Sequence, residues 1–549
     1  MPLQKNQVLT LRVERLSSDG SGVAHSPDGE TVFIPGAAPG DEARVRIVKD
    51  CKRYAFGILD EVLTPSPDRI PVDCAVAGPC GGCSLRHLDY AAELRAKQEN
   101  VADAFARIGG LDVPVLPIVG SPEVNRYRNK VQFPVGVDKS GKPCIGFYAG
   151  RTHRIVPCPD CRLQPGVLNE IGNALCAFFA EKGIQPYSEE TGRGLVRHIF
   201  LRRGAHSGQI MVCLVCTRAK LPSAEELCTR LKAQFAEITT ILLNVNAKNT
   251  NVILGTETHT LYGQGYIEDT LCGVPVQLGP LSFYQVNTLA AEQLYGIAAQ
   301  YAQLTPDDLL LDLYCGMGTI GLSMAAHCRE LIGVEIVPEA IESAKANAAR
   351  MGADVAAKSR FFCADAGQAA TRLAAEGLHP DIVMLDPPRK GCDEATLSAV
   401  VRMSPRRVVY VSCNPATAAR DAAWLEQNGY HAEKVQPVDL FPRTRHVECV
   451  IALSKGEIDS KKVRVEFSLE GMDTLGLQKG ATYPEIKARV LEQTGLKVSS
   501  LYISQVKQKC GLEVRENHHK AKSENIKQPQ CPKEKEDAIV EALKHFQMI

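Results

Sequence analysis

Hydrophobic and polar residues alternate along the first part of the chain. Residues 9–13 and 43–47 carry apolar side chains at every second position, with Thr or Arg between them. This period of two predicts β-strands, and the dipeptides Asp19-Gly20 and Asp28-Gly29 predict turns between strands. Residues 1–63 are therefore expected to form a small β-barrel of about five strands, an architecture that often binds single-stranded RNA but also serves purely structural duties.

The pattern changes after a proline-rich linker at residues 64–71. Residues 64–290 mix strand-like runs with helical segments, which predicts a central α+β domain. Residues 291–454 alternate apolar strands with helices, as expected of a Rossmann-like domain built on a parallel sheet. A Lys-rich linker at about 454–462 then leads to a small C-terminal extension, residues 463–549. The predicted fold class is multidomain α/β.

The C-terminal extension is predicted to be helical. Thr482 and Glu485 have capping-box spacing and open a helix that Gly495 can close. A second helix is expected from about residue 500 to 511, and the two together resemble a helix-turn-helix. The role of the extension is left open between added RNA affinity and a structural accessory. The lysines that could add RNA affinity are Lys497, Lys507 and Lys509. The last helix places four apolar residues on one stripe that is expected to face the core, namely Ile539, Ala542, Leu543 and Phe546.

Composition limits the class of protein. Hydrophobic residues make up 45% of the 549, yet no apolar run approaches the roughly 18–20 residues that a membrane span needs. The first residues lack the apolar segment of a secretory signal, so we expect a cytoplasmic protein. In a reducing compartment its 20 cysteines stay free and closely spaced ones indicate metal binding or catalysis. Net charge is zero, so any RNA-binding surface must be a local basic patch.

A glycine loop follows the first strand of the Rossmann-like domain. The apolar run 309–313 leads into Gly316-Met-Gly318-Thr-Ile-Gly321, and a second apolar run ends in Glu335. Glycines let backbone N–H groups approach a ligand closely, and an acid about 20 residues further on can accept both ribose hydroxyls of an adenosine. The same pattern is found in dinucleotide-binding dehydrogenases, so the loop alone does not decide the class.

The ends of two further strands decide the class of enzyme. One apolar run is followed by Asp386-Pro-Pro-Arg389, and another is followed by Ser412-Cys413-Asn-Pro415. Ligands in such sheets bind beyond the carboxyl ends of the strands. Those ends carry an acid and a thiol, with no evident partner for a nicotinamide. The sheet is therefore predicted to be that of a methyltransferase.

A cysteine in this position suits methylation at carbon 5 of uracil. A thiolate that adds to carbon 6 makes carbon 5 nucleophilic, and a general base must later remove the carbon 5 proton. Cys413 is the natural nucleophile. Glu448 interrupts the start of an apolar strand, where a carboxylate is costly unless it is paired or functional. Glu448 is the preferred base, and His446 is the rival.

Five ordered motifs resemble those of the RNA uracil-5-methyltransferase family. The resemblance spans roughly residues 1–454, and the predicted N-terminal barrel resembles the TRAM module of the 23S ribosomal RNA branch of that family. The motifs are Phe283-Tyr-Gln285-Val-Asn287, Asp312-Leu-Tyr314-Cys-Gly-Met-Gly318, Asp386-Pro-Pro-Arg-Lys-Gly391, Ser412-Cys413-Asn-Pro415 and His446-Val-Glu448.

The resemblance implies S-adenosylmethionine as methyl donor, Cys413 as nucleophile and Glu448 as base. It also implies an RNA substrate whose uridine is flipped out of its stack, and we expect a monomer. Tyr314 stands where the family often has Phe, Thr319 stands where many members have Asn, and Asp365 is aligned across a stretch of variable length. The implied cofactor contacts are Gln285, Tyr314, Thr319, Glu335, Asp365 and Asp386.

The same branch carries a [4Fe–4S] cluster on a C-x5-C-x2-C element plus one distant cysteine. Cys74, Cys80 and Cys83 match that element, and Cys161 is the implied fourth ligand. Cys158 complicates the assignment, because Cys80-x2-Cys83 with Cys158-x2-Cys161 is also ordinary spacing for a structural zinc site. Ligand type alone does not separate the two metals, and the resemblance favours iron–sulfur.

Rival functions remain within and outside enzymes. The nearest is methylation of the T-loop uridine of transfer RNA. A cytosine-5-methyltransferase would also carry a cysteine in the Pro-Pro motif, which Asp386-Pro-Pro-Arg389 lacks. A non-catalytic RNA-binding or ribosome-assembly protein would not need Cys413, Glu448 and Glu335 together. Residues 127–130 and 197–203 carry basic side chains that either contact phosphates or are solvated surface charges.

Overall fold

The structure is a computed structural model that describes residues 3–150, 152–248, 250–456, 483–496, 498–510 and 531–546. It divides into two units, Met1–Asp459 and Ser460–Ile549, which are described separately. Three features predicted from the sequence lie outside the described residues, namely linker positions 457–462, the cap at Thr482 and Lys497. Within the described part, no helix combines the length and apolar character needed to cross a bilayer.

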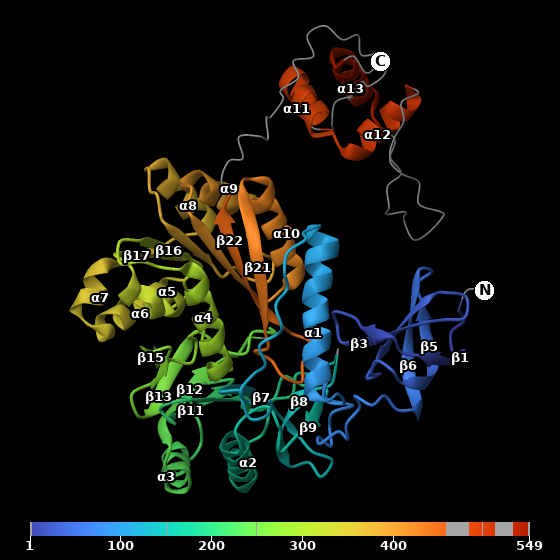
Figure 1. Cartoon of the computed structure of the whole chain (residues 1–549). Helices are drawn as coiled ribbons and strands as arrows, with labels where there is room; N and C mark the ends of the chain where they lie inside the picture. The colour runs from blue at the N-terminus through green and yellow to red at the C-terminus, as the bar shows by residue number, and fades with distance from the viewer. Residues whose placement is uncertain are drawn as a thin grey trace. The chain divides into compact units, whose positions relative to one another are not determined.

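The N-terminal alternation forms one sheet with its own core (Figure 1). Its order is β1-β5-β6-β4-β3-β2, and all pairs are antiparallel except β4 with β6. The sheet has one strand more than expected because a two-residue strand, β2, pairs with β3. The strands are β1 (Val8–Arg12), β2 (Arg15–Leu16), β3 (Ser21–His25), β4 (Thr31–Pro35), β5 (Glu42–Asp50) and β6 (Tyr54–Thr64).

The central domain is a seven-stranded mixed sheet, ordered β13-β12-β11-β10-β7-β8-β9, with α2 (Gly166–Glu181) and α3 (Ala224–Gln234) packed on it. Its inner strand β11 is buried along its whole length, which explains its unbroken apolar sequence. A separate hairpin, β14 (Ile267–Leu271) and β15 (Val274–Leu278), leads to the next domain. The strands are β7 (Lys130–Val137), β8 (Pro143–Tyr148), β9 (Ile155–Pro157), β10 (Val196–Arg203), β11 (Ile210–Cys216), β12 (Ile238–Val245) and β13 (Glu257–Tyr262).

The Rossmann-like domain carries the sheet that positions the candidate site. Its order is β18-β17-β16-β19-β20-β22-β21; the first five strands are parallel and β22 is antiparallel to both neighbours. Hydrophobic side chains form a core on each face. The strands are β16 (Leu309–Leu313), β17 (Glu330–Glu335), β18 (Ser359–Cys363), β19 (Ile382–Leu385), β20 (Arg407–Ser412), β21 (Tyr430–Val438) and β22 (Glu448–Lys455).

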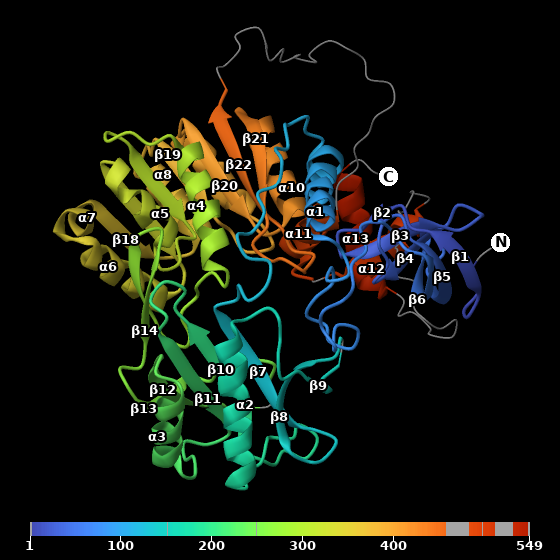
Figure 2. The ribbon, with the colours of Figure 1, turned by 60° about the horizontal axis from the view of Figure 1, so that its bottom comes forward.

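Helices cover both faces of this sheet (Figure 2). Because each strand is sandwiched, its residues are apolar almost without alternation, as in β16 with five buried positions of five. The helices are α4 (Thr288–Ala302), α5 (Thr319–Met324), α6 (Pro338–Met351), α7 (Ala353–Lys358), α8 (Ala366–Ala375), α9 (Glu394–Met403) and α10 (Pro415–Gln427), with a short turn η2 (Ala325–His327) after α5.

A segment from the N-terminal half completes this domain. Helix α1 (Tyr90–Ala104) continues into a π-helical turn, η1 (Phe105–Gly109), and both pack against α10, as Figures 1 and 2 show from two sides. Residues 113–119 then run along β21, where Leu116 N donates to Val435 O at 2.9 Å. Residues 90–119, which the sequence places in the central domain, thus belong to the Rossmann-like core.

The second unit has three described helices around a small apolar core. Helix α11 (Tyr483–Thr494) and α12 (Ser500–Lys509) lie where the sequence predicts a helical pair, and α13 (Lys533–His545) is the third. Ile539, Ala542 and Leu543 of the predicted stripe are buried in the core. Gly495, with φ of +71°, follows α11 in the left-handed conformation expected of a helix terminator.

Candidate active site

Two strand-end acids fix the shape of the glycine loop. Glu335 accepts hydrogen bonds from the N–H groups of Gly316 (3.1 Å) and Val337 (2.9 Å). Asp312 accepts one from Gly321 N at 3.0 Å. A Cβ on Gly321 would lie 2.8 Å from both the Asp312 carboxylate and the Leu331 side chain, so only glycine fits there. These bonds fix the backbone of the loop at the amino end of α5.

Buried acids cluster at the carboxyl ends of β16 and β19. Asp312 is 1% exposed, and its Oδ1 finds no hydrogen-bond partner among the described residues. Burial, with Asp386 and Glu335 nearby, raises the pKa of Asp312 to about 8. Burial likewise raises the pKa of Asp386 to about 7. A buried carboxyl with one oxygen left without a partner is suited to a cationic ligand, because the positive charge of the ligand would offset the cost of burial.

The other predicted cofactor residues surround the same strand ends. Gln285 precedes α4, where its carbonyl accepts from Asn129 Nδ2 at 2.8 Å. The hydroxyl of Thr319, the first residue of α5, lies 3.5 Å from the hydroxyl of Tyr295. Tyr314 adopts a φ of +67°, an uncommon conformation that fits a functional turn. Asp365 caps α8 by accepting from Gln368 N, a structural duty that already accounts for an acid there.

Cys413 and Glu448 stand on neighbouring strands. Ser412, the last residue of β20, pairs with Cys449 of β22. Continued by one residue, this antiparallel register sets Cys413 opposite Glu448, the first residue of β22. Directly opposite residues point to the same face with Cβ atoms roughly 4.5–5.5 Å apart. The two predicted catalytic side chains are thus brought together, at the end of the sheet where Asp386 also lies.

The charges around this pair oppose ionisation. Burial, with Asp386 nearby, raises the pKa of Glu448 to about 8, while Arg389 acts in the opposite direction. Burial also raises the pKa of the Cys413 thiol, with smaller contributions from Glu448 and Asp386, again opposed by Arg389. Glu448 is 6% exposed, whereas the cysteine is partly open to solvent. Arg389 is therefore the group that favours the thiolate.

Asn414 joins the two predicted motif loops. Its side chain accepts from Ala416 N, which caps α10, and its Nδ2 donates to the carbonyl of Arg389 at 3.0 Å. Pro415 occupies the first turn of that helix, where its missing N–H costs nothing. The Ser-Cys-Asn-Pro sequence thus places Cys413 in a short strand-to-helix turn and anchors the Asp386–Arg389 loop beside it.

His446, the rival base, occupies a different electrostatic setting. Burial, followed by Arg389, Arg445 and more distant cations, lowers its pKa to about 4. The ring packs edge to face against Phe441 at 6.0 Å between centroids. A neutral imidazole held among cations is a weak proton acceptor, so the surroundings favour Glu448.

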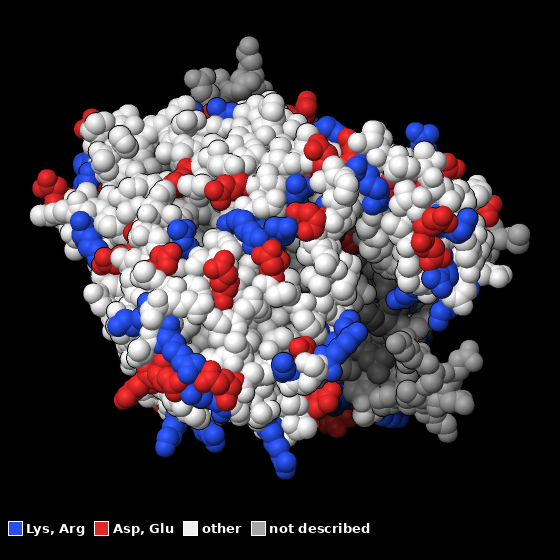
Figure 3. Space-filling model, turned by 90° about the horizontal axis from the view of Figure 1, so that it is seen from below, with Lys and Arg blue, Asp and Glu red and all other residues white. Residues whose placement is uncertain are grey.

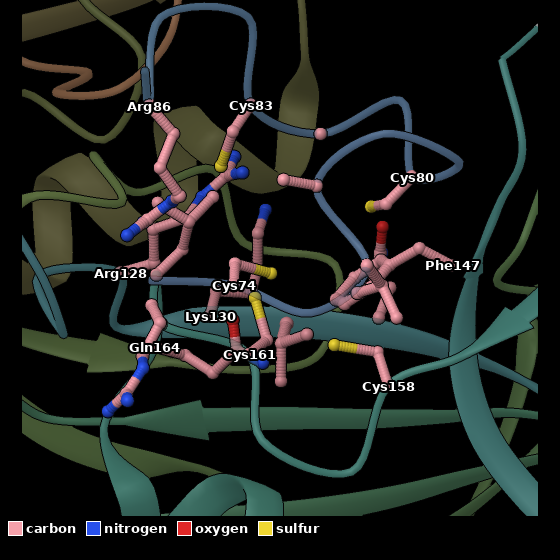
Figure 4. A pocket seen from close by; sticks show the side chains of 17 residues that line it. Cys74, Cys80, Cys83, Arg86, Arg128, Lys130, Phe147, Cys158, Cys161 and Gln164 are labelled. Atoms are coloured by element: carbon pink, nitrogen blue, oxygen red, sulfur yellow. The ribbon is translucent and has the colours of Figure 1, made fainter. Parts of the chain in front are cut away.

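The predicted cluster cysteines line one cavity of about 180 Å³ (Figure 4). Cys74, Cys80 and Cys83 reach it from the loop before α1, and Cys161 reaches it from the loop after β9 together with Cys158. The neighbouring Cys158 thiol, together with Arg86 and Arg128, lowers the pKa of the Cys161 thiol. All five cysteines therefore share one site.

The lining of this cavity fits an anionic, sulfur-ligated group. Arg86, Arg128, Lys130 and Arg162 border it, and Nε and Nη2 of Arg86 have no hydrogen-bond partner within the part of the chain described. Among the same residues, no three His, Cys, Asp or Glu side chains meet closely enough for a single metal ion. Cysteine thiolates are the ligands of both structural zinc ions and iron–sulfur clusters.

On the face shown in Figure 3, Lys and Arg are interspersed with Asp and Glu, in keeping with a net charge of zero. Of the predicted phosphate-binding segments, Tyr127 and Asn129 are buried and bonded inside the protein, to Pro442 O and to Gln285 O. Arg197 and Arg202 are likewise buried and donate to backbone carbonyls. Their side chains serve the fold, while Arg128 and Lys130 stay beside the cysteine cavity.

One set of buried residues escaped the sequence analysis. Lys97 and Glu93 of α1 form a buried ion pair that also includes Asp439, in the connection between β21 and β22. The available signal was a charged pair four residues apart on the buried stripe of α1, which otherwise carries Ala92, Ala96 and Val101. The sequence around these two residues does not indicate that Asp439 is their partner.

The fold and the site together define a class. A sheet in which the last strand runs antiparallel between β20 and β21, with a glycine loop after β16 and an acid ending β17, is that of a Rossmann-like methyltransferase. Comparison with known proteins then gives the family. Residues 200–456 match the model of tRNA (Uracil-5-)-methyltransferases, and residues 2–59 match the TRAM domain.

Two relatives match over nearly their whole length. An uncharacterised RNA methyltransferase of Halalkalibacterium halodurans is 43% identical over 453 residues, 82% of this chain and 98% of that protein. One of Oceanobacillus iheyensis is 41% identical over 455 residues, again 82% and 98%. The chain belongs to the RNA uracil-5-methyltransferase family, which confirms the family predicted from the five motifs.

A solved structure has the same architecture. The crystal structure of Pyrococcus abyssi tRNA (uracil-54, C5)-methyltransferase, in complex with S-adenosyl-L-homocysteine, superposes with a TM-score of 0.65 at 27% identity. The match covers 81% of this chain and 100% of that one. The relatives and this structure leave nearly a fifth of the present chain unmatched, so the chain carries sequence that they lack.

Proposed function

We propose that the protein transfers a methyl group from S-adenosylmethionine to carbon 5 of a uridine in 23S ribosomal RNA. The observation that carries the proposal is the placement of Cys413 beside Glu448, near Asp386, at the end of the sheet that also carries the glycine loop. One thiol and one carboxyl facing the same space are what covalent activation of a pyrimidine ring requires.

The chemistry follows from these two side chains. The Cys413 thiolate adds to carbon 6 of the flipped uracil, and the ring electrons move to give an enolate with a nucleophilic carbon 5. Carbon 5 takes the methyl group, and the carboxylate of Glu448 then removes the proton left on carbon 5. The returning electrons expel the thiolate, which restores the ring double bond and the free enzyme.

S-adenosylmethionine supplies the electrophilic methyl group. The residues that would hold it are Glu335 at the ribose, with Gln285, Tyr314, Thr319, Asp365 and Asp386 around it. The unpaired, buried carboxyl oxygen of Asp312 supports a ligand with cationic groups at this site. The S-adenosyl-L-homocysteine bound to the Pyrococcus abyssi enzyme supports S-adenosylmethionine as the methyl donor.

The choice of 23S ribosomal RNA rests on the TRAM domain and the shared cysteine cavity, which together are features of the ribosomal branch that the sequence resembles. The thiols of Cys74, Cys80, Cys83 and Cys161 would hold a [4Fe–4S] cluster, whose part would be to brace the loop between the barrel and α1. Transfer RNA is the second candidate, because the matching Pyrococcus abyssi structure is of an enzyme that acts on uracil 54 of transfer RNA.

The test is methyl transfer from labelled S-adenosylmethionine to unmodified 23S ribosomal RNA and transfer RNA transcripts, with the product mapped by nuclease digestion. We expect 5-methyluridine in the ribosomal transcript alone. Label confined to transfer RNA would retain the chemistry and overturn the substrate. Label in neither, with RNA binding intact, would support a non-catalytic RNA-binding protein.

A further inference from the structure

The connection between β21 and β22, residues 439–447, leads to Glu448, and residues of α1, more than 330 positions earlier in the sequence, hold it. We propose that Lys97, Glu93 and Tyr90 of α1 are positioning residues for Glu448, acting through Asp439 and Arg443. This inference rests on the proposed function, because it assigns these side chains a part in proton removal by Glu448.

Lys97 makes three contacts to its surroundings and is 1% exposed. Its Nζ donates to Glu93 Oε1 at 2.7 Å, to Asp439 Oδ1 at 2.8 Å and to the carbonyl of Phe441 at 3.1 Å. Three donors of one ammonium are thus all used. Two of the three acceptors belong to the connection that ends at Glu448.

Tyr90 and Glu93 add bonds to the same connection. The Tyr90 hydroxyl donates to Asp439 Oδ2 at 3.0 Å and accepts from Ser121 N at 2.7 Å. Glu93 Oε1 accepts from Arg443 N at 2.7 Å. Three residues on one face of α1 therefore bind both the start and the middle of the connection.

Arg443 is held in an unusual conformation. Its φ of +68° lies in the left-handed region, which a non-glycine residue adopts only when its surroundings fix it. Its guanidinium donates to Leu88 O at 2.8 Å, and its own carbonyl accepts from Ser84 N and Leu85 N at 3.0 and 3.1 Å. Those two donors directly follow Cys83, so the cysteine loop and α1 hold the same turn.

The charges of the network balance only when it is complete. Two buried carboxylates, Glu93 and Asp439, face the ammonium of Lys97 and, at 3.6 Å from Glu93, the guanidinium of Arg443. Without Lys97 the two acids would repel one another at the root of the connection. The connection would then shift, and Glu448 would move relative to Cys413, which stands on the separate strand β20.

The network therefore acts on one step of the reaction. Cys413 is set by the turn into α10, and its attack on carbon 6 does not depend on the connection. Proton removal from carbon 5 does depend on it. A displaced Glu448 leaves a methylated covalent adduct that resolves slowly, whereas general destabilisation lowers the amount of folded enzyme without favouring the adduct.

The experiment follows the denaturation-resistant protein–RNA adduct on gels, together with kcat and KM, for Lys97→Met, Lys97→Arg and Tyr90→Phe. Glu448→Gln is the reference for blocked proton removal. Asp308→Asn is the matched control. It removes a buried carboxylate that is paired with Arg406 at the opposite end of the strands of the same sheet. We expect Lys97→Met to lower kcat at least tenfold with KM for RNA nearly unchanged, and to accumulate the adduct. Lys97→Arg should regain part of kcat.

Tyr90→Phe removes one hydrogen bond to Asp439 and leaves no buried charge without a partner. This variant can therefore be tested even if Lys97→Met does not fold. It should show the same adduct accumulation to a smaller extent, while Asp308→Asn should show none. A folded Lys97→Met or Tyr90→Phe enzyme that turns over without excess adduct overturns the positioning role. Failure of Glu448→Gln itself to accumulate adduct overturns instead the base assigned in the proposed function.

Discussion

Cys413 and Glu448 flank the last residue pair of the β20–β22 register: Ser412 pairs with Cys449, Cys413 follows Ser412, and Glu448 precedes Cys449. This register brings the two residues together on neighbouring strands. It also explains why Glu448 contributes to the raised pKa of the Cys413 thiol, since a carboxylate disfavours a thiolate beside it.

Replacing Cys413 by Ala should abolish methylation, with a loss of roughly 10⁴-fold or more in kcat, since no other group can form the covalent adduct. The measurement is 5-methyluridine by mass spectrometry of digested RNA. Cys328→Ala is the control. Cys328 is also buried in this domain, but it lies before β17, at the end of the strands away from the site. Methylation by the Cys413→Ala protein at more than a trace would rule out the covalent route.

The rate should rise with pH across the neutral range. Glu448 must be ionised to take a proton, and its pKa of about 8 means that the carboxylate form grows as pH increases from 6.5 to 8.5. The raised pKa of the Cys413 thiol acts in the same direction, since only the thiolate adds to the ring. The measurement is kcat/KM against pH at constant ionic strength. A profile that is flat or falls over this range would contradict the assignment of these two groups.

The ligand-free protein should lose stability as pH rises. The folded-state pKa values of Asp312, Asp386 and Glu448, about 8, 7 and 8, lie above the ordinary values of 3.8, 3.8 and 4.5. Between those limits the folded state holds protons that the unfolded state has released, so the free energy of unfolding falls with pH. The stabilising contribution is complete below pH 4 and lost as pH passes 8.

Glu448→Gln tests this linkage, because glutamine keeps the shape of the side chain and cannot ionise. Its stability relative to wild type should increase between pH 5.5 and pH 8.5, as measured by urea unfolding with fluorescence or circular dichroism. Asp308→Asn again serves as the comparison. A difference between wild type and Glu448→Gln that stays constant with pH would show that Glu448 titrates normally in the folded protein.

Cys161→Ala should prevent assembly of the metal group, while Cys158→Ala should permit it. Both thiols line the same cavity, so the two variants differ only in which sulfur remains available as a ligand. Iron, acid-labile sulfide and visible absorbance after anaerobic purification give the readout. Zinc without iron in the wild-type protein would show that the cavity holds a zinc ion and not a cluster. Loss of iron from Cys158→Ala, with iron retained in Cys161→Ala, would make Cys158 the fourth ligand in place of Cys161.

The sequence predicted the parts of this protein that depend on local pattern. The strand ends at Asp312, Asp386 and Cys413 are visible because an apolar run is interrupted by a polar residue. In the structure β16, β19 and β20 end within one residue of these positions. Motif order then identified the family. The barrel was predicted one strand short because a two-residue strand has too few positions to show alternation.

What the sequence did not reveal depends on long-range pairing. Val115 aligns with Val435, and Lys97 bonds Asp439 across 342 residues of sequence. Neither contact changes the local pattern at either end, so residues 90–119 were placed in the central domain. A charged pair on the buried face of α1 was the one indication that a distant partner existed.

The same 342-residue separation sets the order in which the protein can assemble during synthesis. At about 5–20 residues per second, a ribosome needs roughly 20–70 s after completing Lys97 to reach Asp439. Throughout that interval α1 has neither Asp439 to bind Lys97 nor the strand β21 to pack against. The buried face of α1 must therefore stay hydrated, or be shielded by a chaperone, until β21 and Asp439 have been made. The surroundings of Glu448 consequently form late, and a nascent chain released before β21 and β22 lacks both Asp439 and Glu448.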